Sequence, residues 1–248
     1  MTETLVAAAA LAKSFRNGIT ALAGVDLAVA PGEFVGVLGP SGCGKSTLLR
    51  IIAGLIEPSA GRLERSADLV GRIGFVFQDP TLMPWATVSD NVYLPLRLQG
   101  VARGAAAPRI ATMLDSLGLG EFAAAYPRQL SGGMRMRVSI ARALVTQPAL
   151  FLLDEPFAAL DEITRFRLNE DLRALWRRHR CTVIFVTHSV FESVFLSNRI
   201  VVMTKRPGRI VADLAIDLPE TRDNALRLSE RYAECCHTVS RRLAEAMA

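Results

Sequence analysis

The sequence predicts an α/β fold, a doubly wound core of parallel strands with a helical segment inserted in its middle. A glycine-rich loop at 39–47 follows a short apolar strand and opens a helix. Continuous apolar runs at 149–155 and 181–188 are typical of parallel strands that are covered on both faces. Between the loop and these strands, 79–144 has a helical pattern broken by prolines and glycines. Strands that alternate with helices favour an open α/β sheet.

The other elements follow from their patterns in chain order. Short strand-like runs come first, at 5–15, 18–30 and 32–39. A helix is expected from about Gly44 to Ala53, because a glycine such as Gly54 commonly terminates a helix. The remaining expected elements are strands at 72–78, 149–155, 181–188, 199–204 and 209–215, and helices at 162–179 and 222–247. The last helix should pack on the body through an apolar stripe, which consists of Leu228, Tyr232, Cys235, Val239 and Leu243.

Composition limits the class of protein. Half of the 248 residues are hydrophobic, yet no apolar window is long enough to span a bilayer. No basic region precedes the short apolar run near the N-terminus, so a signal peptide is not expected and the chain should stay in the cytoplasm. The four cysteines lack metal-ligand spacing, which favours reduced thiols. The net charge of +5 is scattered, and this favours a solvated surface over a nucleic-acid partner.

The loop at 39–47 has the pattern of a phosphate-binding site. Gly39, Gly44, Lys45 and Ser46 fit G-x-x-x-x-G-K-[ST] between a strand and a helix. Glycines let the backbone N–H groups surround the phosphates, Lys45 would neutralise the β- and γ-phosphates, and the Ser46 hydroxyl would bind Mg²⁺. Cys43 lies inside the loop near a helix N-terminus, so we expect a lowered thiol pKa and alkylation that bound ATP blocks.

Four polar side chains follow the ends of predicted strands. Asp154 and Glu155 end one strand, Gln78 ends a second and His188 ends a third. Ligands of open α/β sheets bind at the carboxyl ends of the strands. Asp154 would therefore hold Mg²⁺, Glu155 would accept a proton from the attacking water, and Gln78 would reach the metal or that water. The alternatives are a helix cap for the acidic pair and a structural polar residue for His188.

A second anion site is indicated at 128–144, where a glycine pair opens an arginine-rich amphipathic helix. Backbone N–H groups and the positive end of the helix dipole both favour an anion at such a start. One chain thus has two phosphate-binding helix starts, which lie more than eighty residues apart in the sequence.

Taken together, these motifs resemble those of the ATP-binding cassette (ABC) ATPases. The loop at 39–47 resembles the Walker A motif, "FLLDE" the Walker B strand, Gln78 the Q-loop, "AALD" at 158–161 the D-loop, "LSGGM" at 130–134 the signature and His188 the switch histidine. The resemblance implies a P-loop NTPase (RecA-like) core with an N-terminal antiparallel β subdomain and an inserted helical subdomain at about 79–145. It also implies an ATPase domain over 1–218 and a helical tail over 219–248.

The resemblance also explains the second helix start. In this family two cassettes meet head to tail, so Ser131, Gly132 and Gly133 would contact the γ-phosphate held by Lys45 of a second copy. The implied nucleotide-binding residues are Phe15, Gly39, Pro40, Ser41, Gly42, Cys43, Gly44, Lys45, Ser46, Thr47, Ser131, Gly132 and Gly133. The implied catalytic residues are Lys45, Gln78, Glu155 and His188, and the implied Mg²⁺ ligands are Ser46, Gln78 and Asp154.

Two positions depart from the family pattern. Met134 stands where the signature usually has glutamine, which puts the contact of that glutamine in question. Phe15 stands where a tyrosine commonly stacks on adenine. The alternative for Phe15 is a phenylalanine of the core.

Two segments resemble a particular branch, the importers of nitrate, sulfonate and taurine, which also includes uptake systems for pyrimidine-type vitamin precursors and so implies a small anionic or heterocyclic solute. They are 82–96, whose residues 82–85 form an apolar patch, and 187–211, which contains R-P-G-R-I at 206–210. In importer cassettes the segment corresponding to 79–96 receives the coupling helix of the permease. The implied partners are a second copy, membrane permease subunits and, indirectly, a solute-binding protein, with no nucleic acid. The implied location is peripheral, at the cytoplasmic face of the inner membrane. The alternatives are a cassette of an exporter or lipid-handling complex, a soluble ABC ATPase, and, for residues 82–85, a core segment.

Overall fold

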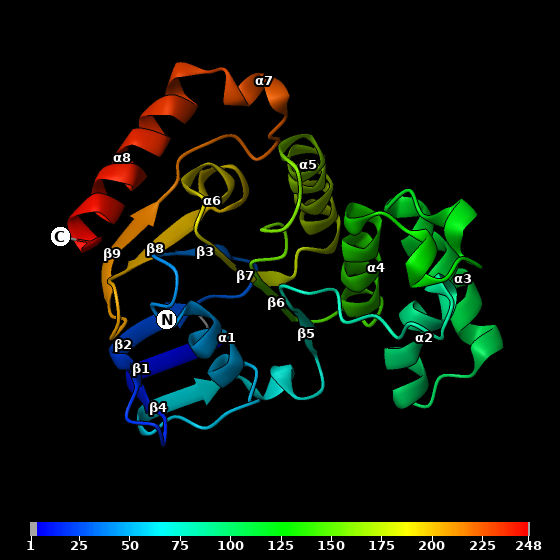
Figure 1. The fold of residues 1–248 in the computed structure, drawn as a ribbon, viewed down its shortest axis with the longest axis horizontal. Helices are drawn as coiled ribbons and strands as arrows, with labels where there is room; N and C mark the ends of the chain where they lie inside the picture. Colours follow the sequence, from blue (N-terminus) through cyan, green and yellow to red (C-terminus); the bar gives the residue numbers. More distant parts are fainter. Residues whose placement is uncertain (1–3, 248) are drawn as a thin grey trace. The chain divides into compact units, whose positions relative to one another are not determined.

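The computed structural model describes residues 4–247, and the predicted α/β fold is confirmed. The chain divides into two compact units. The first unit consists of the chain up to Gly71 and from Arg180 onward, and the second consists of Arg72–His179. The helical segment predicted at about 79–145 lies inside the second unit, which also contains two strands and a long helix. Figure 1 labels the elements of both units.

A three-stranded antiparallel sheet opens the first unit. Its strand order is β2-β1-β4, with β1 at Val6–Ser14, β2 at Thr20–Val29 and β4 at Ala60–Arg65. β1 and β2 are the strands predicted at 5–15 and 18–30. β4 was not predicted, because five of its six residues are exposed and it lacks an alternating apolar pattern. A short 3₁₀ turn at Ala67–Leu69 follows it.

Parallel strands carry the phosphate loop in the same unit. β3 at Phe34–Leu38 is buried along its whole length and lies between β7 at Thr182–Thr187 and β8 at Arg199–Met203. β9 at Ile210–Ala215 pairs antiparallel with β8. In this register Leu38 lies opposite Thr187, so the residues that follow β3 and β7 emerge side by side.

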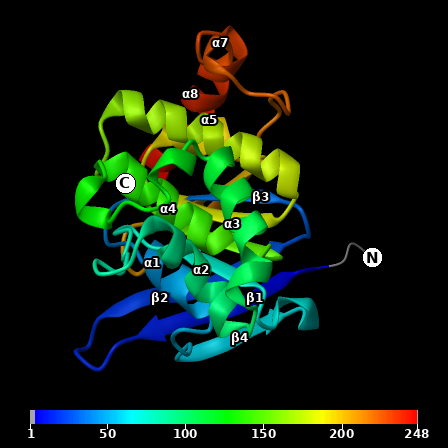
Figure 2. The ribbon, with the colours of Figure 1, turned by 90° about the vertical axis from the view of Figure 1, so that its right-hand side faces the viewer.

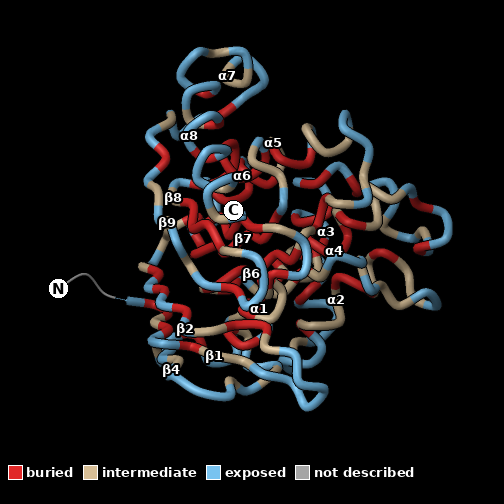
Figure 3. The backbone as a smooth tube through the Cα atoms, turned by 60° about the vertical axis from the view of Figure 1, so that its left-hand side comes forward, coloured by how far each residue is buried: buried red, intermediate tan, exposed pale blue. Residues whose placement is uncertain are grey.

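Helices cover these sheets on both sides. α1 at Lys45–Ile52 contacts β2 and β7 and lies between the two sheets (Figure 1). α6 at Val190–Leu196 packs on β3, and α8 at Glu230–Met247 packs on α6, β8 and β9. The short α7 at Asn224–Arg227 has no buried residue, as its pale colour in Figure 3 shows. The helix α6 was not predicted.

The predicted packing of the last helix is confirmed, but its stripe is shifted. Tyr232, Cys236 and Val239 are the buried residues of α8. Cys235 is half-buried, and Leu228 is 90% exposed, so the prediction that Leu228 belongs to the stripe was wrong. Leu228 precedes α8 and lies in the turn after α7, where the helical spacing no longer applies.

The second unit is built around α4 at Gly132–Leu144. β5 at Ile73–Val76 and β6 at Leu150–Asp154 pair in parallel, and α4 packs on β5. α4 also contacts three helices, α2 at Val88–Leu98, α3 at Arg103–Ser116 and α5 at Glu162–His179 (Figure 2). Two 3₁₀ turns, at Gly120–Phe122 and Pro127–Gln129, connect α3 to α4.

The C-terminal segment holds both ends of α6. The buried Arg222 guanidinium donates hydrogen bonds of 2.9 Å to the carbonyls of Val194, Phe195 and Ser197 at the end of this helix. The Tyr232 hydroxyl donates to the carbonyl of Phe191 at its start, at 2.8 Å. Burial lowers the pKa of Arg222 to about 10, yet it remains charged at neutral pH. The three carbonyls oppose that cost by accepting charged hydrogen bonds.

Replacing Arg222 should therefore destabilise the fold. Arg222→Ala leaves three buried carbonyls without their donor, and we expect a loss of about 3 kcal/mol in the free energy of unfolding. Urea denaturation of both proteins measures it. Arg231→Ala is the control, because its ion pair with Asp217 is exposed and should contribute nothing measurable. Equal stabilities for the two variants would contradict the role given to Arg222.

Candidate functional site

The phosphate loop joins β3 to α1 in the first unit. Gly44 is the N-cap of α1 at φ 109°, and no side chain caps this helix start. Lys45 is buried and its ammonium donates to the carbonyls of Gly39 and Pro40, at 2.9 Å each. An uncapped helix start leaves backbone N–H groups available, and with a lysine folded over the loop it suits an anion.

The phosphate loop packs closely against neighbouring backbone at two positions where only glycine fits, Gly44 in the loop and Gly208 outside it. A Cβ on Gly44 would lie 2.7 Å from the carbonyl oxygen of Ala21 in β2. A Cβ on Gly208, in the turn between β8 and β9, would lie 2.2 Å from the carbonyl oxygen of Cys43. Gly208 also exchanges backbone hydrogen bonds with Ala21 and Ala23. The R-P-G-R-I segment thus supports the phosphate loop from the side of β2, a role that its sequence did not indicate.

The expected reactivity of Cys43 is wrong. Its side chain is 1% exposed, and its sulfur packs beside Gly39, where an added Cβ would come within 2.9 Å of it. A thiol buried to this extent is not accessible to an alkylating reagent. Cys43 can contribute to ligand binding only through its backbone. None of the four cysteines forms a disulfide, in agreement with the expected reduced thiols.

His188 emerges beside the phosphate loop. It directly follows β7, and the Leu38–Thr187 pairing puts it at the same sheet edge as Gly39. The residue is exposed, and its neighbours are fixed. Thr187 donates its hydroxyl to the buried Glu192 at 2.6 Å and accepts the N–H of Ser189 at 3.0 Å. The imidazole is therefore exposed at a strand end whose flanking residues are held by hydrogen bonds.

Phe15 lies in the hairpin between β1 and β2. Its ring is 40% exposed, so the alternative of a core phenylalanine is wrong. The Lys13 ammonium lies 5.5 Å from the ring centroid. The strand that leaves this hairpin contacts Gly44 through Ala21. A face that is open to solvent is what stacking on a planar base requires.

The second unit brings Gln78, Asp154 and Glu155 to one sheet edge. β5 and β6 are in register from Ile73–Leu150 to Val76–Leu153, so Gln78 and the acidic pair both follow the carboxyl ends of neighbouring strands. Asp154 is buried. Glu155 has φ 47°, a left-handed backbone that is rare outside glycine and that often marks functional positions.

The glycine-bounded start of α4 lies in this unit too. Ser131 is the N-cap, and its hydroxyl accepts the N–H of Met134 at 3.2 Å. A Cβ on Gly133 would lie 2.6 Å from the Thr164 methyl group of α5, whereas a Cβ on Gly132 would meet Leu160 at an ordinary 3.5 Å. Gly133 is thus required for packing against the segment after β6, and the sequence did not indicate this.

The arginines of α4 make hydrogen bonds and an ion pair within the protein. Arg135 donates to the carbonyl of Leu130 at 2.7 Å, and Arg137 pairs with Asp171 of α5 at 2.9 Å. Burial raises the pKa of Asp171 and the Arg137 charge opposes this shift. Arg142, in the last turn, bonds to residues 80 and 81. Only the backbone at the start of α4 remains for an anion.

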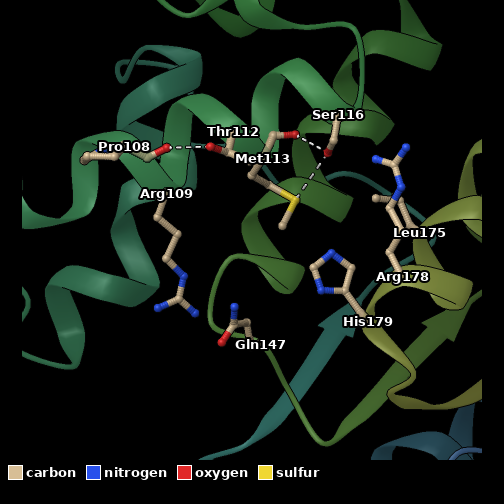
Figure 4. Close-up of a pocket in the computed structure, with 9 residues that line it drawn as sticks. All are labelled: Pro108, Arg109, Thr112, Met113, Ser116, Gln147, Leu175, Arg178 and His179. Atoms are coloured by element: carbon tan, nitrogen blue, oxygen red, sulfur yellow. Dashed lines mark hydrogen bonds between the residues drawn. The ribbon is translucent and has the colours of Figure 1, made fainter.

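A cavity of about 400 Å³ also lies in the second unit, away from these residues (Figure 4). Arg109 of α3 and His179 at the end of α5 are among its lining residues, and no predicted site residue is. Burial and the neighbouring Arg178 lower the pKa of His179. Basic residues in the last turn of α5 oppose the negative end of that helix. The basic residues that α5 contributes to this cavity, Arg178 and His179, therefore belong to the end of that helix.

Comparison with known families decides the identity of the fold. The family model described as "ABC transporter" matches residues 22–158, more than half of the chain. The chain belongs to the ABC transporter family. It is an ATP-binding and ATP-hydrolysing subunit of a transporter.

Relatives with import functions cover most of this ABC ATPase. The aliphatic sulfonates import ATP-binding protein SsuB 1 of Pseudomonas syringae pv. syringae is 47% identical over 83% of this chain and 84% of its own length. The nitrate import ATP-binding protein NrtD of Synechocystis sp. is 44% identical over 82% of this chain and 78% of its own length.

A solved structure supports the same assignment. It is the dimeric post-hydrolysis state of an ATP-binding cassette bound to ADP and Pi. It is 33% identical, has a TM-score of 0.75, and matches 86% of this chain and all of its own. Within residues 4–247, none of the helices of this ABC ATPase combines the length and apolarity needed to cross a bilayer.

The packing of Gly133 gives a prediction that needs no nucleotide. Gly133→Ala should lower the free energy of unfolding by about 1–3 kcal/mol, because the new methyl overpacks against the stiff Thr164 side chain. Thr164→Ser removes the opposing methyl and should restore most of that stability in the double variant. Gly132→Ala, one residue away, is the matched control and should be neutral. Thermal unfolding without ATP measures all four, and a stable Gly133→Ala protein would show that packing does not require this glycine.

Proposed function

We propose that this ABC ATPase energises a membrane importer for a small, anionic or heterocyclic solute of the nitrate, sulfonate and taurine type. The observation that carries the proposal is the pair of glycine-bounded helix starts, at α1 and α4. The import names of relatives at 44–47% identity favour an importer over an exporter or a soluble ABC ATPase.

Two copies form the working unit in this proposal. Lys45 and the N–H groups at the start of α1 bind the phosphates of ATP, and Phe15 stacks on the adenine. Ser131, Gly132 and Gly133 of the second copy contact the γ-phosphate. The dimeric state of the similar solved cassette supports pairing. Because hydrolysis removes the γ-phosphate, it removes the contact that favours the closed pair.

The catalytic roles follow from the chemistry of the side chains. Glu155 accepts the proton of the attacking water, and His188 and Gln78 orient the water and the γ-phosphate. Ser46, Gln78 and Asp154 would hold Mg²⁺ together with the phosphates, since hydroxyl, amide and carboxylate oxygens suit this ion. Bound Mg²⁺ supplies charge neutralisation. No cluster of three His, Cys, Asp or Glu residues within 4–247 offers a metal site by itself, so this site depends on the nucleotide.

A permease is the proposed membrane partner. The segment after Gln78 carries Trp85, which is 77% exposed and has the exposed Pro84 beside it. An exposed tryptophan at an irregular turn is suited to a hot spot of an interface. The ATPase would then work as a peripheral protein at the cytoplasmic face of the inner membrane, and a solute-binding protein would deliver the solute to the permease.

Trapping the nucleotide tests the paired state. Glu155→Gln should retain ATP binding, lower phosphate release by about 100-fold or more, and sediment as a dimer in ATP but not in ADP. Adding Lys45→Ala to that variant should abolish the dimer, because the phosphates lose their cation. Normal turnover by Glu155→Gln would remove Glu155 from the role of general base.

Copurification from membranes tests whether the ATPase binds a permease through Trp85. The tagged chain should retain its permease, and Trp85→Ala should weaken that association by about 2 kcal/mol, roughly thirtyfold in Kd. Leu228→Ala removes a comparably exposed apolar side chain elsewhere and should change nothing. Solute uptake by the reconstituted complex that requires a solute-binding protein would support import, and ATP-driven release of solute would favour the exporter alternative.

A further inference from the structure

The segment that carries Trp85 is fixed to the rest of the second unit by two side chains. We call residues 79–87, which connect β5 to α2, the strap. Arg142 holds its first half. The guanidinium donates to the carbonyl of Thr81 at 2.8 Å, to the carbonyl of Pro80 at 2.9 Å and to the Thr81 hydroxyl at 3.0 Å. Thr81 has φ 46°, so these three bonds hold a residue in a costly left-handed conformation.

Asn91 of α2 holds the second half of the strap. Its side chain is fully buried and accepts the N–H of Met83 at 2.8 Å. Its amide group lies within 3.0–3.2 Å of the carbonyls of Met83, Ala86 and Thr87 and donates to them. The Asn91 side chain therefore holds the turn that presents Trp85 from the buried side.

Arg142 connects the strap to α4, the helix that begins at the signature motif. It lies in the last turn of α4, and Ser131 is the N-cap at the other end. Thirteen helical residues extend over roughly 20 Å. Because α4 is packed on β5 and on three helices, it can transmit a displacement along its axis without bending.

The arrangement at Arg142 is costly to maintain. The side chain is half-buried, and desolvation lowers its pKa. No carboxylate pairs with it in the part of the chain that the structure describes. A leucine would fill the same space without desolvating a charge. What an arginine adds is a set of directed bonds to two successive carbonyls of the strap.

We propose that Arg142 is the positioning residue that couples the strap to the start of α4, so that a permease bound at Trp85 and a nucleotide bound at Ser131–Gly133 influence each other. This proposal rests on the proposed function and names the residue through which the partner reaches the site. Coupling is reciprocal, so engagement of the signature by ATP must alter the strap even without the permease.

The two tryptophans make this measurable in the isolated chain. Trp85 is 77% exposed on the strap and Trp176 is 3% exposed in α5. In the double variant Trp176→Phe, Glu155→Gln, Trp85 is the sole tryptophan, and hydrolysis is blocked. Acrylamide quenching and the emission maximum of Trp85 are recorded with and without MgATP, while sedimentation of the same samples reports pairing.

We expect ATP to shift the Trp85 emission and quenching in this parent protein, and Arg142→Gln to abolish the shift while pairing persists. Arg142→Lys keeps the charge but cannot donate to two carbonyls with a planar guanidinium, so it should give a partial Trp85 shift. It replaces Arg142→Gln in the test if the glutamine variant does not fold. Arg137→Gln is the matched control on the same helix. It breaks the pair with Asp171 and should lower stability but leave the Trp85 response intact.

The outcomes separate the coupling role from the proposed function. Two results would overturn the role of Arg142 and leave the proposed function standing, and in both the proteins pair in ATP. In the first, the Trp85 shift is equal in the parent and in the Arg142→Gln variant. In the second, the parent shows no Trp85 shift. Failure of the parent to pair in ATP refutes the proposed function, and the coupling role fails with it. In the complex with the permease, Arg142→Gln should copurify normally but lose permease stimulation of ATP hydrolysis by about 5-fold or more.

Discussion

The phosphate loop depends on backbone segments that approach one another where no side chain would fit. Gly44 lies against the carbonyl of Ala21 in β2, and Gly208 lies against the carbonyl of Cys43. These contacts join three distant parts of the chain around one helix start. Because neighbouring backbone, and not a capping side chain, fixes that start, its N–H groups stay available for phosphate. Because backbone from other parts of the chain holds the loop in place, no side chain of the loop has to cap the start of α1.

The two helix starts are built differently, and this suits different tasks. The start of α1 has no cap and a buried lysine, which favours tight binding of a charged ligand. The start of α4 is capped by Ser131 and packed through Gly133, so it is already ordered before any ligand arrives. An ordered surface loses little entropy when it docks and releases readily when the contact is removed. In the proposed pair, the start of α1 would hold the nucleotide and the start of α4 of the second copy would dock on it.

Local patterns in the sequence predicted most of the fold and the strand ends that carry the candidate site residues, because strands buried on both faces and a glycine-rich loop have strong local patterns. The apolar runs predicted as strands at 149–155 and 181–188 contain β6 and β7, and Gly39, Lys45 and His188 follow their strands as expected. The exposed β4 and the short α6 have no such pattern. Arg142, Asn91 and Gly208 act through partners 4 to 187 residues away, and only the folded chain identifies them. The burial of Cys43 likewise depends on packing.

The hydrogen bonds from the C-terminal segment to α6 have a practical consequence for shortening the chain. The ATPase domain inferred from motifs ends near Leu218, which makes that point an attractive place to truncate or to splice a chimeric cassette. Yet Arg222 and Tyr232, which lie beyond it, secure the helix that follows His188 at both ends. A shortened chain would keep every recognisable motif but leave that helix unsupported, so the minimal cassette of this protein extends at least as far as Val239.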